Sequence, residues 1–262
     1  MPTPPRAALL LAAALVLAPT ARAQDADPAP FTWSGAVGAG GWMQIRNVNG
    51  SVRVEGTSGS EVEVRATKRV RRGSADDVRV EVRRFDGGRS VVACAVWGES
   101  TCDEDGYHGR SNTRESDVRV DFVVRVPRGV NVEPHTVNGT VRVADVTGEV
   151  RASTVNGDVE AYSLGGPVEV ETVNGDVDAR MGRVGTRDMR FGTVNGSVTL
   201  ALPAALDADV ELDTVNGHFD ADYPLTLSGR VNPRHLRATI GRGGPRLKVS
   251  TVNGSVKLKK AG

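Results

Sequence analysis

A four-residue motif, Thr-Val-Asn-Gly, constrains the fold of this chain more than any other sequence feature. It occurs at 136–139, 154–157, 172–175, 193–196, 214–217 and 251–254, with a variant, Asn-Val-Asn-Gly, at 47–50. Eight of the 11 asparagines lie in these seven copies, and the motif asparagines from Asn138 onward step by 18, 18, 21, 21 and 37 residues. Such self-similarity predicts stacked copies of one structural unit. We interpret the 37-residue step as two units, one of them degenerate.

Apolar residues alternate with polar ones on both sides of the motif. In one copy Val150 and Ala152 precede it, and Val159 and Ala161 follow it. A period of two indicates a half-buried strand on each side. The alternation changes phase across Thr-Val-Asn-Gly, so we expect the motif to form a bend, for which Asn-Gly is suited because both residues tolerate positive φ.

Two architectures fit these strands. Asn-Gly between alternating strands is a signal for antiparallel hairpins. In the alternative, a parallel β-solenoid, equivalent positions stack about 4.8 Å apart. One outward column favours the solenoid, because three residues before each threonine the charge alternates in sign, at Glu133, Arg151, Glu169, Arg190, Glu211 and Lys248. Stacked in register, every charge would lie between two opposite ones.

Stacking also predicts a role for the motif asparagines. Amides at the same corner of successive units can donate hydrogen bonds to, and accept them from, their neighbours. We therefore expect a structural corner ladder of Asn49, Asn138, Asn156, Asn174, Asn195, Asn216 and Asn253. A calcium-binding repeat would need nine-residue spacing and regular aspartates. Only Asp158 and Asp176 follow an Asn-Gly directly in the six full copies, so we expect no metal site and no cofactor.

The composition after residue 23 agrees with an all-β chain. This part holds 40 valines against 10 leucines and two isoleucines. β-Branched side chains lose χ1 freedom in helices and fit a pleated surface. The composition therefore disfavours an all-α or helix-rich fold.

The N-terminus is typical of a secretory signal. Arg6 precedes an apolar run at 7–17 that is too short to span a bilayer, and Ala21-Arg22-Ala23 forms a small-residue cleavage site. We predict a signal peptide at 1–23, with a membrane anchor as the alternative. A flexible stretch at 24–31 and one domain at 32–262 follow, with regular units at about 132–258. The mature chain is then exported to the periplasm or cell surface, with no further membrane span.

The charge balance argues against nucleic-acid binding. Loss of 1–23 removes two arginines and no acid, which changes 33 basic and 32 acidic residues to 31 and 32, a net charge of −1. A nearly neutral chain has no overall field that attracts nucleic acid.

The first half of the chain is less regular. Residues 43–54 fit the repeat, and further strands are expected at 61–66, 77–85, 90–96 and 117–126, with a turn at 86–88. Basic residues cluster at Arg65, Lys68, Arg69, Arg71 and Arg72. We interpret them as a solvated edge that blocks sheet association. The alternative is a patch for anionic envelope polymers.

Cys94 and Cys102 are the only cysteines. In an oxidising compartment they predict a local disulfide. A metal-binding pair is disfavoured because only His108 lies nearby. The polar stretch 99–116 is expected to be an exposed, mobile excursion held by the disulfide.

No catalytic motif is present. The chain lacks Gly-x-Ser-x-Gly, His-Glu-x-x-His and a Walker loop. The best enzymatic candidates are Asp158 with Asp176 and Glu160 with Asp178, which should stack in neighbouring units. Adjacent carboxylates could share a proton or a metal, as in a polysaccharide-active enzyme.

The motif array, with Val126-Pro127-Arg128-Gly129-Val130 before it and a C-terminal block that includes Tyr223-Pro224-Leu225-Thr226 and Thr239-Ile240-Gly241, resembles a known family. It is a bacterial family of "putative adhesins" with β-strand repeats, a domain of unknown function related to head domains of autotransporter adhesins. The resemblance covers most of 32–258. It implies a right-handed β-helix-like stack and supplies no catalytic residues.

The leading hypothesis is therefore an exported, non-enzymatic, adhesin-like binding or structural module of the cell envelope or surface. Its partner is not named by the sequence; envelope polysaccharide and surface protein are the candidate classes. Two alternatives stay open. One is the polysaccharide-active enzyme, and the other is a scaffold or sensor accessory that assembles through its ends.

Overall fold

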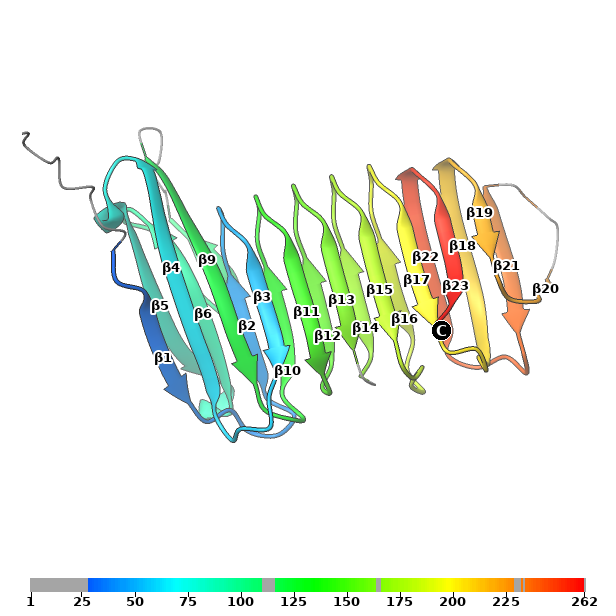
Figure 1. Cartoon of the computed structure of the whole chain (residues 1–262), viewed down its shortest axis with the longest axis horizontal. Helices are drawn as coiled ribbons and strands as arrows, with labels where there is room; N and C mark the ends of the chain where they lie inside the picture. Colours follow the sequence, from blue (N-terminus) through cyan, green and yellow to red (C-terminus); the bar gives the residue numbers. More distant parts are fainter. Residues whose placement is uncertain (1–27, 110–115, 164–165, 229–231, 233, 262) are drawn as a thin grey trace, which may run out of the picture.

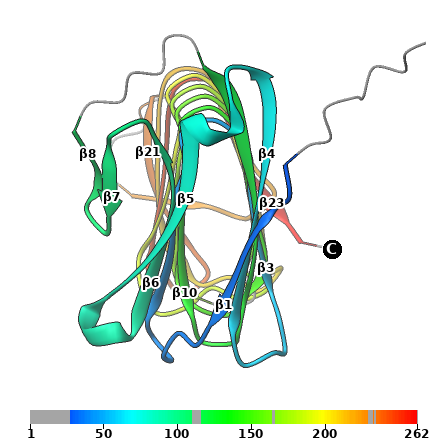
Figure 2. The same cartoon turned by 90° about the vertical axis from the view of Figure 1, so that its left-hand side faces the viewer.

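The computed structural model describes residues 28–109, 116–163, 166–228, 232 and 234–261. Two long sheets face each other along the molecule, which is seen from the side in Figure 1 and end-on in Figure 2. The predicted signal peptide, 1–23, lies outside the described residues, as does 24–27. Within the described part of the chain, no helix is long and apolar enough to cross a membrane.

The first sheet has ten strands and is called sheet A. In spatial order its strands are β1 (Phe31–Gly35), β4 (Val62–Arg72), β9 (Asp117–Val126), β3 (Val52–Gly56), β11 (Val141–Val146), β13 (Val159–Ser163), β15 (Val177–Met181), β17 (Val198–Leu202), β23 (Val256–Lys260) and β19 (Phe219–Ala221).

The second sheet has eleven strands and is called sheet B. In spatial order its strands are β20 (Thr226–Leu227), β21 (His235–Ile240), β18 (Ala208–Asn216), β22 (Arg246–Asn253), β16 (Met189–Gly192), β14 (Val168–Glu171), β12 (Val150–Ser153), β10 (Asn131–His135), β2 (Trp42–Arg46), β6 (Ser90–Trp97) and β5 (Val78–Phe85). A separate hairpin comprises β7 (Thr101–Asp103) and β8 (Gly106–His108), and two short 3₁₀ turns are η1 (Ala75–Asp77) and η2 (Asp86–Gly88).

The middle strands of both sheets pair in parallel and in register. In sheet B, Val150 pairs with Val168 and Arg151 with Glu169. In sheet A, Val159 pairs with Val177. The hairpin meander is therefore wrong for the motif region, and the chain is all-β with two long, mostly parallel sheets, as in a β-solenoid.

Antiparallel strands close the N-terminal end of both sheets and the far end of sheet B, whereas the far end of sheet A is the short strand β19, parallel to β23. At the N-terminal end β4 pairs with β1 and β9, and β5 pairs with β6. At the other end β21 pairs with β18 and β20. The four strands expected in the irregular half are present, although β4 extends to Arg72, and the turn expected at 86–88 is η2. Such closing strands leave no long parallel edge open to another sheet.

The order of the last copies differs from the prediction. The 251–254 copy packs between the copies at 193–196 and 214–217, because β22 pairs with both β16 and β18. The 37-residue step is therefore not two stacked units. After β19 the chain forms β20 and then β21, which runs antiparallel to β18. It then forms β22, which lies on the other side of β18, between β18 and β16.

This order also changes the charge column. Lys248 lies between Arg190 and Glu211, so two cations are neighbours at one step. The prediction that every charge lies between opposite charges is wrong there. It assumed that order in the sequence equals order in space.

The space between the sheets is one continuous hydrophobic core. The inward residues before and after the motif form columns, and Val150, Val170, Val177 and Leu247 are at most 1% exposed. Full burial of a valine or leucine contributes about 1.5–3 kcal/mol. The excess of valine is thus explained, since β-branched side chains fill the same inward positions in successive layers.

Candidate functional site

Each position of the Thr-Val-Asn-Gly corner has its own contact. The threonine is buried, and its hydroxyl donates a hydrogen bond to the glycine carbonyl of the neighbouring copy; Thr172 Oγ1 lies 2.9 Å from the oxygen of Gly157. In the variant copy Asn47 replaces threonine and its Nδ2 donates to the carbonyl of Gly50 at 3.1 Å. Sequence reasoning did not assign this role, although the threonine recurs in all six full copies.

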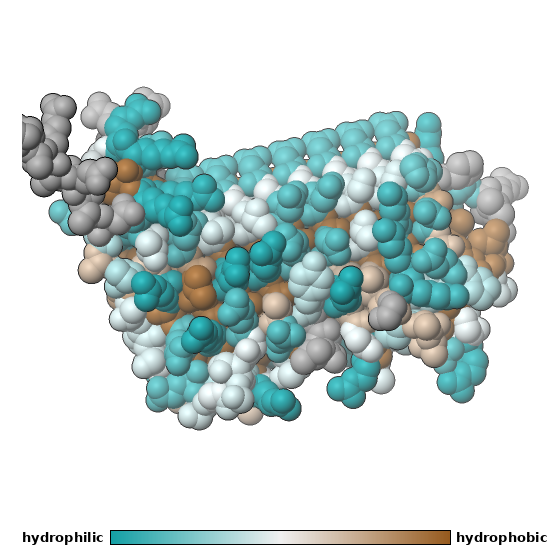
Figure 3. All heavy atoms as spheres, viewed as in Figure 1, coloured by the Kyte–Doolittle hydropathy of each residue, from teal (hydrophilic) through white to brown (hydrophobic). Residues whose placement is uncertain are grey.

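The motif asparagines form a continuous row of amide hydrogen bonds. In the spatial order Asn49, Asn138, Asn156, Asn174, Asn195, Asn253 and Asn216, the Nδ2 of every asparagine after Asn49 donates to the Oδ1 of the one before it, at 2.8–2.9 Å. The upper edge of the molecule in Figure 3 is a regular hydrophilic row along the bends that join the two sheets. The valines of the motif lie beside it, and Val215 is 50% exposed.

Glycine ends the motif because adjacent copies approach closely there. A Cβ on Gly157 would lie less than 3.0 Å from the carbonyl oxygen of Gly139 in the next copy. Any side chain would therefore push the two layers apart. The corner therefore holds adjacent layers together, and its exposed surface consists of asparagine amides and valine side chains.

The carboxylates considered for catalysis do stack, but they have other partners. Asp158 Oδ1 accepts the backbone N–H of Asp176 at 2.8 Å, and Asp176 Oδ1 accepts that of Ser197 at 2.8 Å. Glu160 pairs in register with Asp178 on the next strand. It also accepts two hydrogen bonds from the guanidinium of Arg142, at 2.8 and 2.6 Å.

The stretch expected to be an exposed, mobile excursion contains the hairpin β7–β8, which lies outside β6 in Figure 2. Cys94 on β6 and Cys102 on β7 form a disulfide. Cys102 is fully buried, against Val92, Val96 and Tyr107. Apart from Cys102, the hairpin residues are exposed or partly exposed, as expected, and the disulfide together with the buried Cys102 side chain holds the hairpin on the sheet. Residues 110–115 lie outside the described part.

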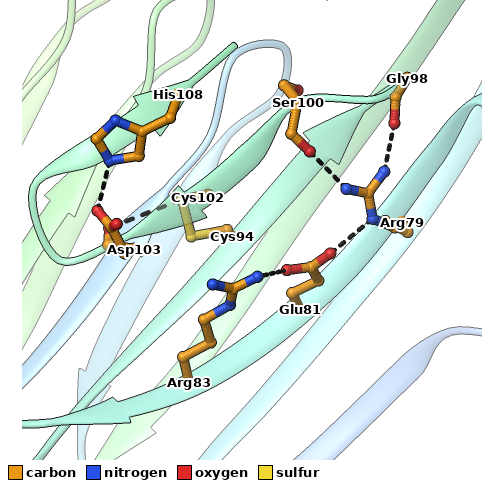
Figure 4. Close-up of polar contacts among 9 residues, drawn as sticks. All are labelled: Arg79, Glu81, Arg83, Cys94, Gly98, Ser100, Cys102, Asp103 and His108. Carbon is orange, nitrogen blue, oxygen red and sulfur yellow. Dashed lines mark hydrogen bonds and ion pairs between the residues drawn. A yellow bond between two sulfur atoms is a disulfide. The ribbon is translucent and has the colours of Figure 1, made fainter.

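Polar contacts fix the hairpin and its approach, as shown in Figure 4. Arg79 on β5 donates to the carbonyls of Gly98 and Ser100 in the loop that leads to the hairpin. Glu81 accepts hydrogen bonds from Arg79 at 2.6 Å and from Arg83 at 2.8 Å, and the bond from Arg79 is the main cause of its lowered pKa. Within the hairpin, His108 Nε2 lies 2.8 Å from Asp103 Oδ1.

A polar cluster lies where the hairpin meets the parallel strands of sheet B. Arg46 Nη2 lies 2.7 Å from Glu133 Oε1 and donates to the Glu104 carbonyl at 3.0 Å. His135 Nδ1 lies 2.8 Å from Ser153 Oγ. Burial lowers the pKa of His135, and the charge of Arg46 adds to the effect, so this imidazole is neutral near pH 7.

Beyond the hairpin the outer face of sheet B is a flat array of polar columns. The central column consists of Gln44, Glu133, Arg151, Glu169, Arg190, Lys248, Glu211 and Arg237. Two shallow grooves cross this face, of about 260 and 360 Å³, and Arg246 lines both. The side chains of Arg246 and Arg237 make no ion pair or hydrogen bond with other described residues.

The basic cluster identified in the sequence lies mostly at an exposed sheet edge, as the sequence predicted. Arg65, Lys68, Arg69, Arg71 and Arg72 all lie on β4, and β1 covers only Val62–Ala66 of that strand. Lys68 Nζ donates to the carbonyl of Ala75 at 2.9 Å, and Arg69 Nε lies 3.3 Å from Asp121 Oδ2. The uncovered half of β4 is thus a charged sheet edge.

The fold is thus that of an all-β protein with two long, mostly parallel sheets joined by a repeated corner, consistent with a β-solenoid. The chain belongs to the toastrack family DUF4097, whose model matches residues 109–259. This confirms the family resemblance that the motif array indicated.

The fold is similar to those of solved structures described as a "putative cell adhesion protein" and a "putative adhesin". A "putative cell adhesion protein" from Clostridium sporogenes has a TM-score of 0.45 at 10% identity and covers 89% of this chain and 100% of its own. A "putative adhesin" from Bacteroides fragilis has a TM-score of 0.30 at 11% identity, covering 89% and 97%. No curated protein shows significant sequence similarity. The proposals below therefore rest on the geometry of this chain.

Proposed function

We propose that the protein is an exported, non-enzymatic, adhesin-like module that binds a ligand at, or provides structure to, the cell envelope or cell surface. In this proposal 1–23 is a removed signal peptide, 24–31 is flexible, and 32–262 is one right-handed β-solenoid domain with rungs of 18–21 residues. The disulfide supports an oxidising compartment, the periplasm or the exterior. The continuous core from Val37 to Leu258 supports a single domain.

The observation that carries the proposal is the outer face of sheet B. Parallel strands repeat about every 4.8 Å, so its polar columns present side chains at regular intervals over a long, flat surface. The grooves on it are shallow and mixed in charge. Such a face suits an extended or broad partner, an envelope polysaccharide or a surface protein, better than a small substrate that needs enclosure.

The carboxylate contacts support a non-enzymatic role. A general acid or nucleophile must be free to reach substrate. Asp158 and Asp176 instead accept backbone N–H groups of the next layer, and Glu160 is held by Arg142. The polysaccharide-active enzyme stays the second candidate. Asp158→Asn and Asp176→Asn keep an acceptor oxygen for those N–H groups, so an enzyme using these charges would lose activity on polymers while staying folded.

The direct test is binding of the purified chain to cell-wall, polysaccharide and surface-protein fractions. Arg246→Gln with Arg237→Gln removes two unpaired cations from the outer face of sheet B. Lys257→Gln with Lys259→Gln, on the outer face of sheet A, is the matched control. We expect binding to fall at least fivefold only for the first pair. Binding of no fraction, together with cleavage of a glycan, would refute the proposal.

The scaffold or sensor accessory makes a different prediction. Assembly through the ends of the stack would raise the sedimentation coefficient as concentration increases. A binding module that acts as a monomer would keep one value over the same range.

A further inference from the structure

Three side chains with metal-ligating groups converge at the far end of sheet B, on β18 and β21. Glu211 and Asp213 are two residues apart on β18 and so point to the same face. His235 on β21 is the cross-strand partner of Asp213. One nitrogen or oxygen from each of the three lies within 4.8 Å of the other two, and His235 Nδ1 contacts Asp213 Oδ1 directly. Paired strands therefore hold the three groups close enough for small side-chain movements to bring them around one ion.

The surroundings favour ligation over free solvation. The exposed fractions of the side chains are 18% for Glu211, 33% for Asp213 and 37% for His235. Both strands lie within the sheet, and β18 is paired on both sides. Among the described residues, this is the only set of three or more His, Cys, Asp or Glu side chains brought so close together.

The ligand chemistry selects a class of ion. One imidazole nitrogen with two carboxylate oxygens suits divalent first-row metals such as Zn²⁺ and Mn²⁺. Ca²⁺ prefers six to eight oxygen ligands, which this set does not supply. We propose that Glu211, Asp213 and His235 form a binding site for a divalent transition metal, with the remaining coordination positions open to water or to an oxygen of a bound partner.

Two basic side chains compete with the ion. Lys248 Nζ lies 3.3 Å from Glu211 Oε1, and Arg237 is the cross-strand partner of Glu211. Lys248 is there because β22 inserts beside β18. An ion must therefore draw Glu211 away from Lys248. It follows that Asp213 and His235 are the primary ligands, and that removing the ammonium of Lys248 strengthens binding.

The chain supplies a matched control. The hairpin pair of His108 and Asp103 has the same two ligand types at 2.8 Å, but it belongs to no set of three. If two groups at the surface were enough to bind the metal, this pair would bind as well. The proposal requires the third ligand and therefore one ion per chain.

The test is calorimetric titration of the purified full chain, carrying no histidine tag, with Zn²⁺ and separately with Mn²⁺ and Ca²⁺. We expect one Zn²⁺ per chain and weaker or no response to Ca²⁺. Asp213→Asn and His235→Gln should each weaken Zn²⁺ binding tenfold or more. His108→Gln should leave it unchanged, and Lys248→Gln should tighten it at least threefold.

Thermal unfolding with and without Zn²⁺ provides a second readout. An ion that binds only the folded chain raises the midpoint, and the rise should vanish in His235→Gln while that variant keeps its metal-free midpoint. The absence of Zn²⁺ binding, binding that His108→Gln abolishes, or weaker binding in Lys248→Gln would each overturn the proposal. If Asp213→Asn fails to fold, the Lys248→Gln and His108→Gln results still decide.

Discussion

Replacement of Thr172 by valine should destabilise the stack although the two side chains have nearly the same shape. Thr172 is 5% exposed, and its hydroxyl donates a hydrogen bond to the carbonyl of Gly157. No other described residue donates to that carbonyl. Valine cannot donate, so the carbonyl of the half-buried Gly157 would lose its partner. Such a loss costs about 1–3 kcal/mol. The corner lies near the surface and water can partly replace the hydroxyl, so we expect a loss of about 1–2 kcal/mol in the free energy of unfolding.

The matched control is Thr199→Val on β17. Thr199 faces outward on the same stack and makes no side-chain hydrogen bond with other described residues, so the same substitution should change stability by less than about 0.5 kcal/mol. Urea unfolding followed by circular dichroism measures both variants. Equal stability of Thr172→Val and the wild type, or equal losses in both variants, would refute the assigned role of the threonine.

Fluorescence gives an independent check on cooperativity. The three tryptophans, Trp33, Trp42 and Trp97, all lie on strands at the N-terminal end of the stack. In repeat proteins each layer contacts mainly its neighbours, so distant layers can unfold separately. If Thr172→Val shifts the circular-dichroism midpoint and leaves the fluorescence midpoint unchanged, the loss is confined to the motif region and no single unfolding free energy applies.

Three further changes test other contacts. Gly157→Ala should cost about 1–3 kcal/mol, because its Cβ collides with the adjacent layer, while Gly182→Ala, with no atom within 4 Å of its Cβ, should be neutral in the same urea titration. Reduction of Cys94–Cys102 should lower stability by about 2–3 kcal/mol, as expected for a short closed loop, and should speed proteolysis of the hairpin; unchanged cleavage would contradict this. The pKa of His135 is lowered in the folded chain, so its stability contribution is present above about pH 6.5 and is lost as the pH falls below that value. The free energy of unfolding should be lower at pH 5.5 than at pH 7.5, and the difference should be smaller in His135→Gln.

The regular part of the fold was predictable because its signals are local. Alternation of apolar residues fixes which side chains point inward, and the recurring Asn-Gly fixes where the chain bends. The order of the last layers was not predictable from these signals. Asn195 could accept equally well from Asn216, the next copy in the chain, or from Asn253, its actual neighbour, so the motif does not say which copies are adjacent. Which copies become neighbours depends on β21, which lies outside the repeat and pairs antiparallel with β18.

The unpredicted parts of the candidate sites share this cause. The hairpin β7–β8 is short and polar, and it lies against residues of other strands, among them Arg46 on β2 and Val92 on β6. Asp213 and His235 are 22 residues apart and meet only through the pairing of β18 with β21. The buried role of threonine was detectable in principle, since one polar residue recurs at a fixed place beside apolar columns.

The position of β22 and β23 inside the stack limits the order in which the layers of the fold can form during synthesis. In a stack built in chain order, loss of C-terminal residues removes an end layer and leaves the others in contact. Here residues 246–260 form an internal layer, and the segment that closes the stack, 208–240, precedes them in the chain. During synthesis from the N-terminus, one side of β18 therefore stays unpaired until residues 246–253, which form β22, have been made. Synthesis through residue 260 is thus a condition for closing the far end of the molecule.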